Sequence, residues 1–245
     1  MKALAATVLA LSLGLGLVAC TRETPPPGIA FAPWDKSHAS KPDFAQVDYA
    51  HPIPAAEMAK ITPEYLATLE QEQIDQIYAR LTAGPIPDGA FDGKILLPKG
   101  ASGKLRLAEI VGGFAGKALE LKGLMLDELG EGIWRGKVFY REERVLRNRI
   151  EDLSVLKKMG LVTDEPKKMD FHGKETWLLF PAKLYCGQSL LDARRESIII
   201  DYFFTDEIPG YQENPDFLAG RRGLRVRDEI RMIRPGLYLG RAYLD

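Results

Sequence analysis

The second half of the chain shows the clearest alternation of apolar and polar positions. From residue 132 onward, short runs rich in β-branched and aromatic residues are separated by turn formers, which is typical of antiparallel strands. Six strands are expected, at Trp134–Tyr140, Arg144–Ile150, Thr176–Tyr185, Glu196–Phe204, Leu224–Ile233 and Leu237–Leu244. Residues 131–245 are therefore predicted to form a curved antiparallel sheet or partial β-barrel.

Helical spacing precedes these strands, in residues 61–130. Thr62 is a suitable N-cap, Pro63 suits the first helical position, and Gly84-Pro85 ends the run. Apolar residues recur at helical spacing between them, at Leu66, Leu69, Ile74, Ile77, Tyr78 and Leu81. Residues 105–129 have leucines at helical spacing interrupted by glycines, so one helix and two shorter ones are both open. The expected fold class is α+β, with N-terminal helices followed by the sheet.

Two further segments are expected to lack regular structure. Prolines recur through residues 20–60, and a proline cannot donate a backbone hydrogen bond, so this segment is predicted to be a tether. Phe31, Trp34, Phe44 and Tyr49 interrupt it and are expected to hold its later part against the domain. The stretch from Gly84 to Gly93 is rich in turn formers and is predicted to be a loop.

Composition removes some classes of partner. The chain has 34 acidic and 33 basic residues, so its balanced charge gives no reason to expect a nucleic acid. Hydrophobic residues make up 46%, which supports a folded core. Of the two cysteines, Cys186 is expected to pack as a small buried hydrophobe, because no motif supplies it with a positioned base.

The other cysteine, Cys20, follows an uncharged apolar run at residues 3–19, with Lys2 before it. This order is typical of a secretory signal, and Leu17-Val18-Ala19-Cys20 resembles the lipobox of bacterial lipoprotein precursors. The resemblance implies a signal peptide at residues 1–19 and a diacylglyceryl group on Cys20 that anchors the chain in a lipid bilayer. By the sorting pattern of the enterobacterial lipoproteins that this segment resembles, Thr21 rather than Asp after the cysteine implies the outer membrane of a bacterial envelope, facing the periplasm. A signal anchor with a chance cysteine, and a disulfide with Cys186, are the alternatives.

Gly132-Ile133-Trp134-Arg135-Gly136 resembles the G-x-W-x-G signature that opens the first strand of lipocalin-like barrels. In that family, the tryptophan closes one end of the barrel and stacks beneath an arginine from a late strand. The resemblance implies that residues 132–245 bind a small apolar molecule. A glycine-flanked tryptophan in an ordinary sheet is the alternative.

The C-terminal hairpin offers the best candidate site. Arg234-Pro235-Gly236-Leu237 suits a type II turn, and a two-residue loop would pair Ile230 with Arg241 and Asp228 with Tyr243. In that register Asp228 and Arg241 share an apolar face, while Arg225, Arg227, Glu229 and Arg231 lie on the wet face.

Because opposite charges on a buried face should pair, we expect an Asp228–Arg241 ion pair, with Tyr243 beside it and Trp134 against the guanidinium. The pair would either fix the register or let Arg241 bind the carboxylate or phosphate of a ligand. A bulge near Asp228 would remove both possibilities.

No other chemistry emerges. His38, His51 and His172 lack metal-ligand spacing, and neither a G-x-S-x-G elbow nor a phosphate loop is found, so no catalytic residue, metal or cofactor is assigned. The leading expectation is an envelope lipoprotein that binds a small apolar or amphipathic molecule, or a partner protein. The alternatives are a structural or assembly lipoprotein without a ligand, and a hydrolase or isomerase using Asp228 or Asp201 near Tyr202.

Overall fold

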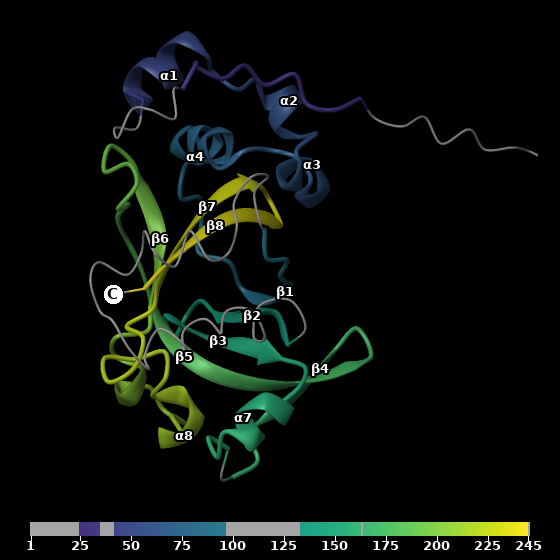
Figure 1. Cartoon of the computed structure of the whole chain (residues 1–245), viewed down its shortest axis with the longest axis vertical. Helices are drawn as coiled ribbons and strands as arrows, with labels where there is room; N and C mark the ends of the chain where they lie inside the picture. Colours follow the sequence, from purple (N-terminus) through teal and green to yellow (C-terminus); the bar gives the residue numbers. More distant parts are fainter. Residues whose placement is uncertain (1–24, 35–41, 97–132, 163, 245) are drawn as a thin grey trace, which may run out of the picture.

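The computed structural model describes residues 25–34, 42–96, 133–162 and 164–244. These residues form a few short helices and an open, strongly curled antiparallel sheet that makes a half-barrel (Figure 1). The expected α+β class with a partial barrel is thereby confirmed.

The sheet follows the order β1-β2-β3-β5-β6-β7-β8, with β4 paired to β5. The strands are β1 (Gly89–Asp92), β2 (Trp134–Tyr140), β3 (Val145–Ile150), β4 (Lys168–Phe171), β5 (Lys174–Gln188), β6 (Glu196–Asp201), β7 (Arg227–Arg234) and β8 (Leu237–Tyr243). The helices are α1 (Phe44–Ala50), α2 (Ala55–Met58), α3 (Pro63–Ala67), α4 (Gln71–Ala79), α7 (Ser154–Lys158), α8 (Glu213–Asp216) and the 3-10 turn η1 (Thr205–Glu207).

Two apolar cores lie on the two faces of the sheet. The concave face carries one core, which includes Phe139, Leu146, Ile200 and Ile230. The second core joins α3 and α4 to the other face of β7 and β8, where Ile233 and Leu239 are buried among helical residues. Figure 1 shows α1 to α4 gathered at one end of the molecule, beyond β7 and β8, with α7 and α8 at the opposite end. The strand β7 is therefore covered on both faces, whereas Gly240 and Ala242 on the concave side of β8 are exposed.

All six expected strands are present with small shifts at their ends, and two further strands were missed. The strand β4 forms a hairpin with β5, and β1 lies in the stretch expected to be a loop. Gly136 permits β1 to pair with β2, because a Cβ there would lie 2.0 Å from the carbonyl oxygen of Phe91. The strand β1 could not be predicted from the local sequence, because the residues around it are turn formers.

The helical prediction needs two corrections. The run expected as one helix from Thr62 to Leu81 is two helices, α3 and α4. Thr62 caps α3 as expected, but the Thr68 hydroxyl donates to the carbonyl of Tyr65, and Glu70 starts α4 through a capping box with Gln73. The second correction is that α1 and α2 lie within the expected tether. The helical prediction for residues 105–129 lies outside the described residues.

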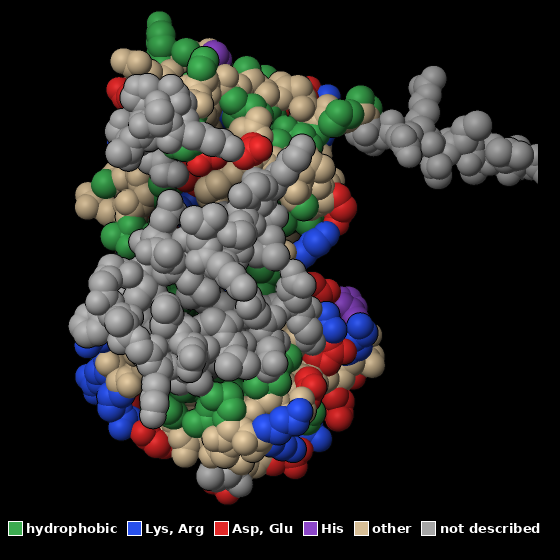
Figure 2. All heavy atoms as spheres, in the orientation of Figure 1, with side chains coloured by type: hydrophobic (Ala, Val, Ile, Leu, Met, Phe, Trp, Pro, Cys, Tyr) green, Lys and Arg blue, Asp and Glu red, His purple; other side chains and the backbone are tan. Residues whose placement is uncertain are grey.

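The aromatic residues of the tether behave differently from one another. Phe44 is buried and Phe31 packs against the helical core, so this part of the chain is held to the domain as expected. Tyr49, by contrast, is 91% exposed. Cys186 is also exposed, which contradicts the expectation of a buried cysteine. Charge is mixed on the visible surface: Figure 2 shows acidic and basic side chains interspersed around β4 and α7, where Lys168 pairs with Glu165 and Glu175.

The register of the β7–β8 hairpin differs from the predicted one. Arg234 pairs with Leu237 across the turn as expected, and Gly236 has the positive φ of 82° that the second central position of a type II turn requires. A bulge between Met232 and Arg234 then shifts every later pair by one residue, so Arg241 lies opposite Glu229. The predicted pairs beyond the turn are wrong for this reason, because a shift of one residue exchanges the faces of the strand.

Candidate functional site

A cluster of polar side chains lies within the concave face of the half-barrel. Lys137 of β2, Asn148 of β3, Asp228 of β7 and Tyr202, which follows β6, converge from four segments of the sheet. The Lys137 Nζ donates to Asp228 Oδ2 at 2.9 Å, to the Tyr202 hydroxyl at 2.7 Å and to Asn148 Oδ1 at 2.9 Å. The Tyr202 hydroxyl in turn donates to Asp228 Oδ2 at 3.3 Å. We refer to these four residues as the interior cluster.

Trp134 closes one side of the interior cluster. Its indole N–H donates to Asn148 Oδ1 at 2.9 Å, and its ring centroid lies 5.4 Å from the Lys137 Nζ. Simple alternation would place Trp134 and Lys137 on opposite faces of β2. The bulge between Trp134 and Gly136 adds one residue and brings both side chains to the same face.

The surroundings of the interior cluster are apolar. Leu146 and Ile150 flank Asn148 on β3, and Ile230 follows Asp228 on the same face of β7; all three are buried in the concave core. Lys137 and Asp228 keep only 15% and 14% of their side-chain surface exposed. An isolated charge in such a place is very costly, so each of these charges depends on the other.

The pKa values of Lys137 and Tyr202 in the interior cluster are both raised. Burial alone would lower the pKa of the Lys137 amine, but Asp228 and Tyr202 together raise this pKa above its ordinary value. Burial raises the pKa of the Tyr202 hydroxyl to about 12, although Lys137 opposes the shift. At neutral pH, Lys137 is therefore an ammonium and Tyr202 a neutral phenol, which suits recognition better than acid–base catalysis.

The four residues predicted for the site separate into two pairs. Asp228 and Trp134 belong to the interior cluster. Arg241 and Tyr243 lie on the other face of the sheet, where Arg241 forms an ion pair with Asp75 of α4 and donates to the Tyr243 hydroxyl at 3.1 Å. The predicted Asp228–Arg241 ion pair is wrong, as is the stacking of Trp134 on Arg241. The bulge that shifts the β7–β8 register carries Arg241 to the helical face.

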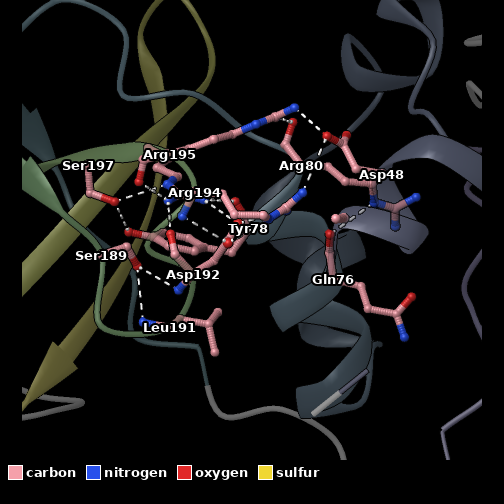
Figure 3. Close-up of polar contacts among 12 residues, drawn as sticks. Asp48, Gln76, Tyr78, Arg80, Ser189, Leu191, Asp192, Arg194, Arg195 and Ser197 are labelled. Carbon is pink, nitrogen blue, oxygen red and sulfur yellow. Dashed lines mark hydrogen bonds and ion pairs between the residues drawn. The ribbon is translucent and has the colours of Figure 1, made fainter. Parts of the chain in front are cut away.

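Of the four residues expected on the wet face of β7, Arg225 is exposed and Arg227 half-buried, but Glu229 and Arg231 are buried. Glu229 and Arg231 have no exposed surface, because α4 and the segment 189–195 cover them. The Arg231 guanidinium donates to the carbonyls of Tyr78, Asp192 and Arg195 and to the Ser197 hydroxyl, and it lies over the Tyr78 ring. Figure 3 shows the surrounding network, in which Tyr78 of α4 contacts Ser197 of β6 at 2.9 Å. This network ties the helices to the sheet.

Lys137 and Asn148 were missed by sequence reasoning, whereas Tyr202 was named beside Asp228 or Asp201 in the enzyme alternative. Asn148 carries a usable signal, since it is a polar residue with Leu146 and Ile150 two positions away on either side. Tyr202 continues the inward alternation of Ile198 and Ile200. Lys137 carries no such signal, because Val138 and Phe139 beside it are buried on opposite faces of β2 and the pattern does not show which face Lys137 shares.

A groove of about 530 Å³ lies on the other side of β3, lined in part by Tyr140, Arg147 and Leu178. None of the predicted site residues borders it. Over the described ranges, no three side chains of the metal-binding types gather closely enough to hold an ion.

Two features from the sequence cannot be placed. Cys20 and Gly132 both lie outside the described residues. Within the part of the chain that the structure covers, none of the helices has the length and apolar character needed to span a bilayer. Comparisons with protein-family models, with curated proteins and with solved structures found no match to this chain.

Proposed function

We propose that this protein is a lipid-anchored protein of the bacterial envelope that binds a small amphipathic molecule against the concave face of its half-barrel. The interior cluster would receive the polar end of the ligand, and the apolar side chains around it would contact the body. Acylated Cys20 would hold the domain at the membrane, where amphipathic molecules are abundant.

One observation carries the proposal: a lysine–aspartate ion pair lies within an otherwise apolar concave face. Hydrophobic residues of similar volume often stabilise a fold at least as well as a buried ion pair does. A pair retained at the centre of a curved sheet, with Trp134, Asn148 and Tyr202 aligned on it, has the composition of a ligand site, in which few polar groups are placed among apolar ones.

The proposal is tested by native mass spectrometry of the full chain, released from detergent micelles after purification from a bacterial host. We expect a reproducible additional mass that is non-covalent and disappears on denaturation. The matched variant is the double substitution Lys137→Met with Asp228→Leu, which replaces the ion pair by apolar side chains of similar size. It should fold and lose the additional mass. A wild-type chain that carries no such mass, or a double variant that keeps it, would contradict the proposal.

A further inference from the structure

The donors of the interior cluster are fully used. The three N–H groups of Lys137 are directed at three different oxygens, and the two N–H groups of Asn148 go to the carbonyl of Phe180 and the Tyr202 hydroxyl. The Tyr202 proton goes to Asp228, and the indole N–H of Trp134 goes to Asn148. A ligand that needs hydrogen-bond donors, such as a carboxylate or a phosphate, would have to break one of these bonds.

Charge at the cluster is also balanced. The ammonium of Lys137 and the carboxylate of Asp228 are 2.9 Å apart and cancel at a distance. An anionic head group would approach Asp228 with the same sign of charge, and a cationic one would approach Lys137 likewise. Neither would find a free counter-charge in this low-dielectric setting.

One acceptor remains. Both hydrogen bonds to Asp228 arrive at Oδ2, from Lys137 and from Tyr202, and no described residue donates to Oδ1. An ionised carboxylate can accept about four hydrogen bonds, so this side chain has unused capacity. Asp228 also keeps 14% of its side-chain surface exposed.

From this balance of donors, charges and acceptors we infer that the ligand presents an uncharged hydrogen-bond donor, a hydroxyl or an amide N–H, to Asp228 Oδ1. The inference rests on the proposed binding function and specifies its ligand class: a neutral amphiphile, in preference to a fatty acid, a phosphate-headed lipid or an amine.

The test uses three photoreactive probes with the same twelve-carbon chain, each carrying a diazirine: dodecanol, lauric acid and dodecylamine. Each is titrated against the full-length protein in detergent, and labelling is read by mass spectrometry on the peptides that contain β2 and β7. We expect dodecanol to reach half-maximal labelling of these peptides at a concentration about tenfold lower than either charged probe.

Asp228→Asn provides the internal check. It leaves the Lys137 ammonium without its counter-charge, so lauric acid should now label better than dodecanol. The matched control is Asp170→Asn on β4, where the exposed Asp170 accepts from the Gly173 N–H at 3.3 Å; this variant should keep the wild-type order.

The outcomes separate the two proposals. Labelling of the β2 and β7 peptides with lauric acid or dodecylamine preferred in the wild type would overturn the head-group inference and leave the binding function standing. If no probe labels these peptides at any concentration, the binding function and the inference both fail. The wild-type order of the three probes decides the question even if Asp228→Asn does not fold.

Discussion

At the scale of single residues, Lys137 and Asp228 should be far more costly to change singly than together. Lys137→Met leaves the Asp228 carboxylate buried without a counter-charge, and breaking a buried pair in this way costs about 3 to 5 kcal/mol of folding free energy. The double variant Lys137→Met with Asp228→Leu should recover most of this loss. Urea unfolding of the three proteins measures this loss of folding free energy and its recovery. Equal stability of the single variant and the wild type would show that the pair is not needed for folding.

Tyr202 predicts a loss of stability in alkali. Its pKa is raised from an ordinary 10.0 to about 12, so between these values the unfolded chain has lost a proton that the folded chain retains. Stability from this group is complete below pH 10 and falls as pH rises toward 12, by up to about 1.4 kcal/mol per pH unit. The raised pKa of Lys137 acts in the same direction.

The measurement is the unfolding free energy of wild type and Tyr202→Phe at intervals from pH 8 to pH 11.5. The variant should lose stability less steeply above pH 10. Other buried phenols, such as Tyr78, whose pKa is raised by burial, contribute to both proteins and cancel in the comparison. Tyr49→Phe is the control, since that ring is 91% exposed, and it should follow the wild type. If the unfolding free energy of Tyr202→Phe fell with pH as steeply as that of the wild type, Tyr202 would not have the raised pKa proposed for it.

How far individual site residues could be predicted depends on backbone regularity. Asp228 lies on the inward face that alternation from Ile230 predicts, because β7 is regular between these residues. Lys137 could not be placed in this way, since its neighbours Val138 and Phe139 are buried on opposite faces of β2 and the bulge at Trp134–Gly136 puts Trp134 out of step with the residues after it. A bulge depends on what packs against the strand, here β1 over Gly136, and this contact comes from a segment more than 40 residues away in the chain.

At the scale of elements, the β7–β8 hairpin shows why a correct turn does not guarantee a correct register. The predicted turn from Arg234 to Leu237 is present, yet the strands slip by one residue immediately beyond it. The local pattern is compatible with both registers, because Leu237 and Leu239 are apolar and would be buried in either. The helices decide between them: the bulge places Ile233 and Leu239 together in the helical core. That preference is tertiary and cannot be read from the hairpin alone.

Arg231 is the buried charge that joins separate elements, since its guanidinium links β7 to α4 and to the segment 189–195. Arg231→Met would remove the guanidinium donor from the Asp192 and Arg195 carbonyls and leave the Tyr78 carbonyl with the Leu81 N–H alone, so we expect a loss of about 3 kcal/mol of unfolding free energy. Arg231→Lys should recover only part of the lost stability. An ammonium has three N–H donors on a single nitrogen, so it cannot span the acceptors that the planar guanidinium reaches.

Thermal unfolding checks this prediction, with Arg222→Met as the matched control. Arg222 makes an exposed ion pair with Glu213, and because solvent screens such a pair, its loss should change the unfolding temperature little. A wild-type unfolding temperature for Arg231→Met would mean that the helices do not depend on this guanidinium.

At the scale of the whole molecule, the order of elements along the chain was enough to predict the fold class. Helices followed by alternating strands predict α+β, and the half-barrel agrees with this. The separation into a helical segment at 61–130 and a sheet at 131–245 is less complete than the prediction, because β1 joins the sheet and Ile233 joins the helical core. The sequence pattern shows which residues alternate, but it does not show that β7 is covered on both faces.

The last prediction concerns how the whole molecule meets the membrane, and Cys186 supplies its control. If Cys20 carries the lipid, a palmitate analogue added to growing cells should label the wild-type chain and the Cys186→Ser variant equally, and Cys20→Ser not at all. Each buried CH₂ contributes about 0.8 kcal/mol, so two or three acyl chains hold a protein firmly and their loss should move Cys20→Ser out of the membrane fraction. Because the chain has two cysteines and Cys186 is exposed on β5, the pair of variants tests both possible thiols. Label on Cys20→Ser but not on Cys186→Ser would show that the lipid is attached to Cys186. The membrane would then lie against β5 of the sheet, and not at the N-terminal end of the chain.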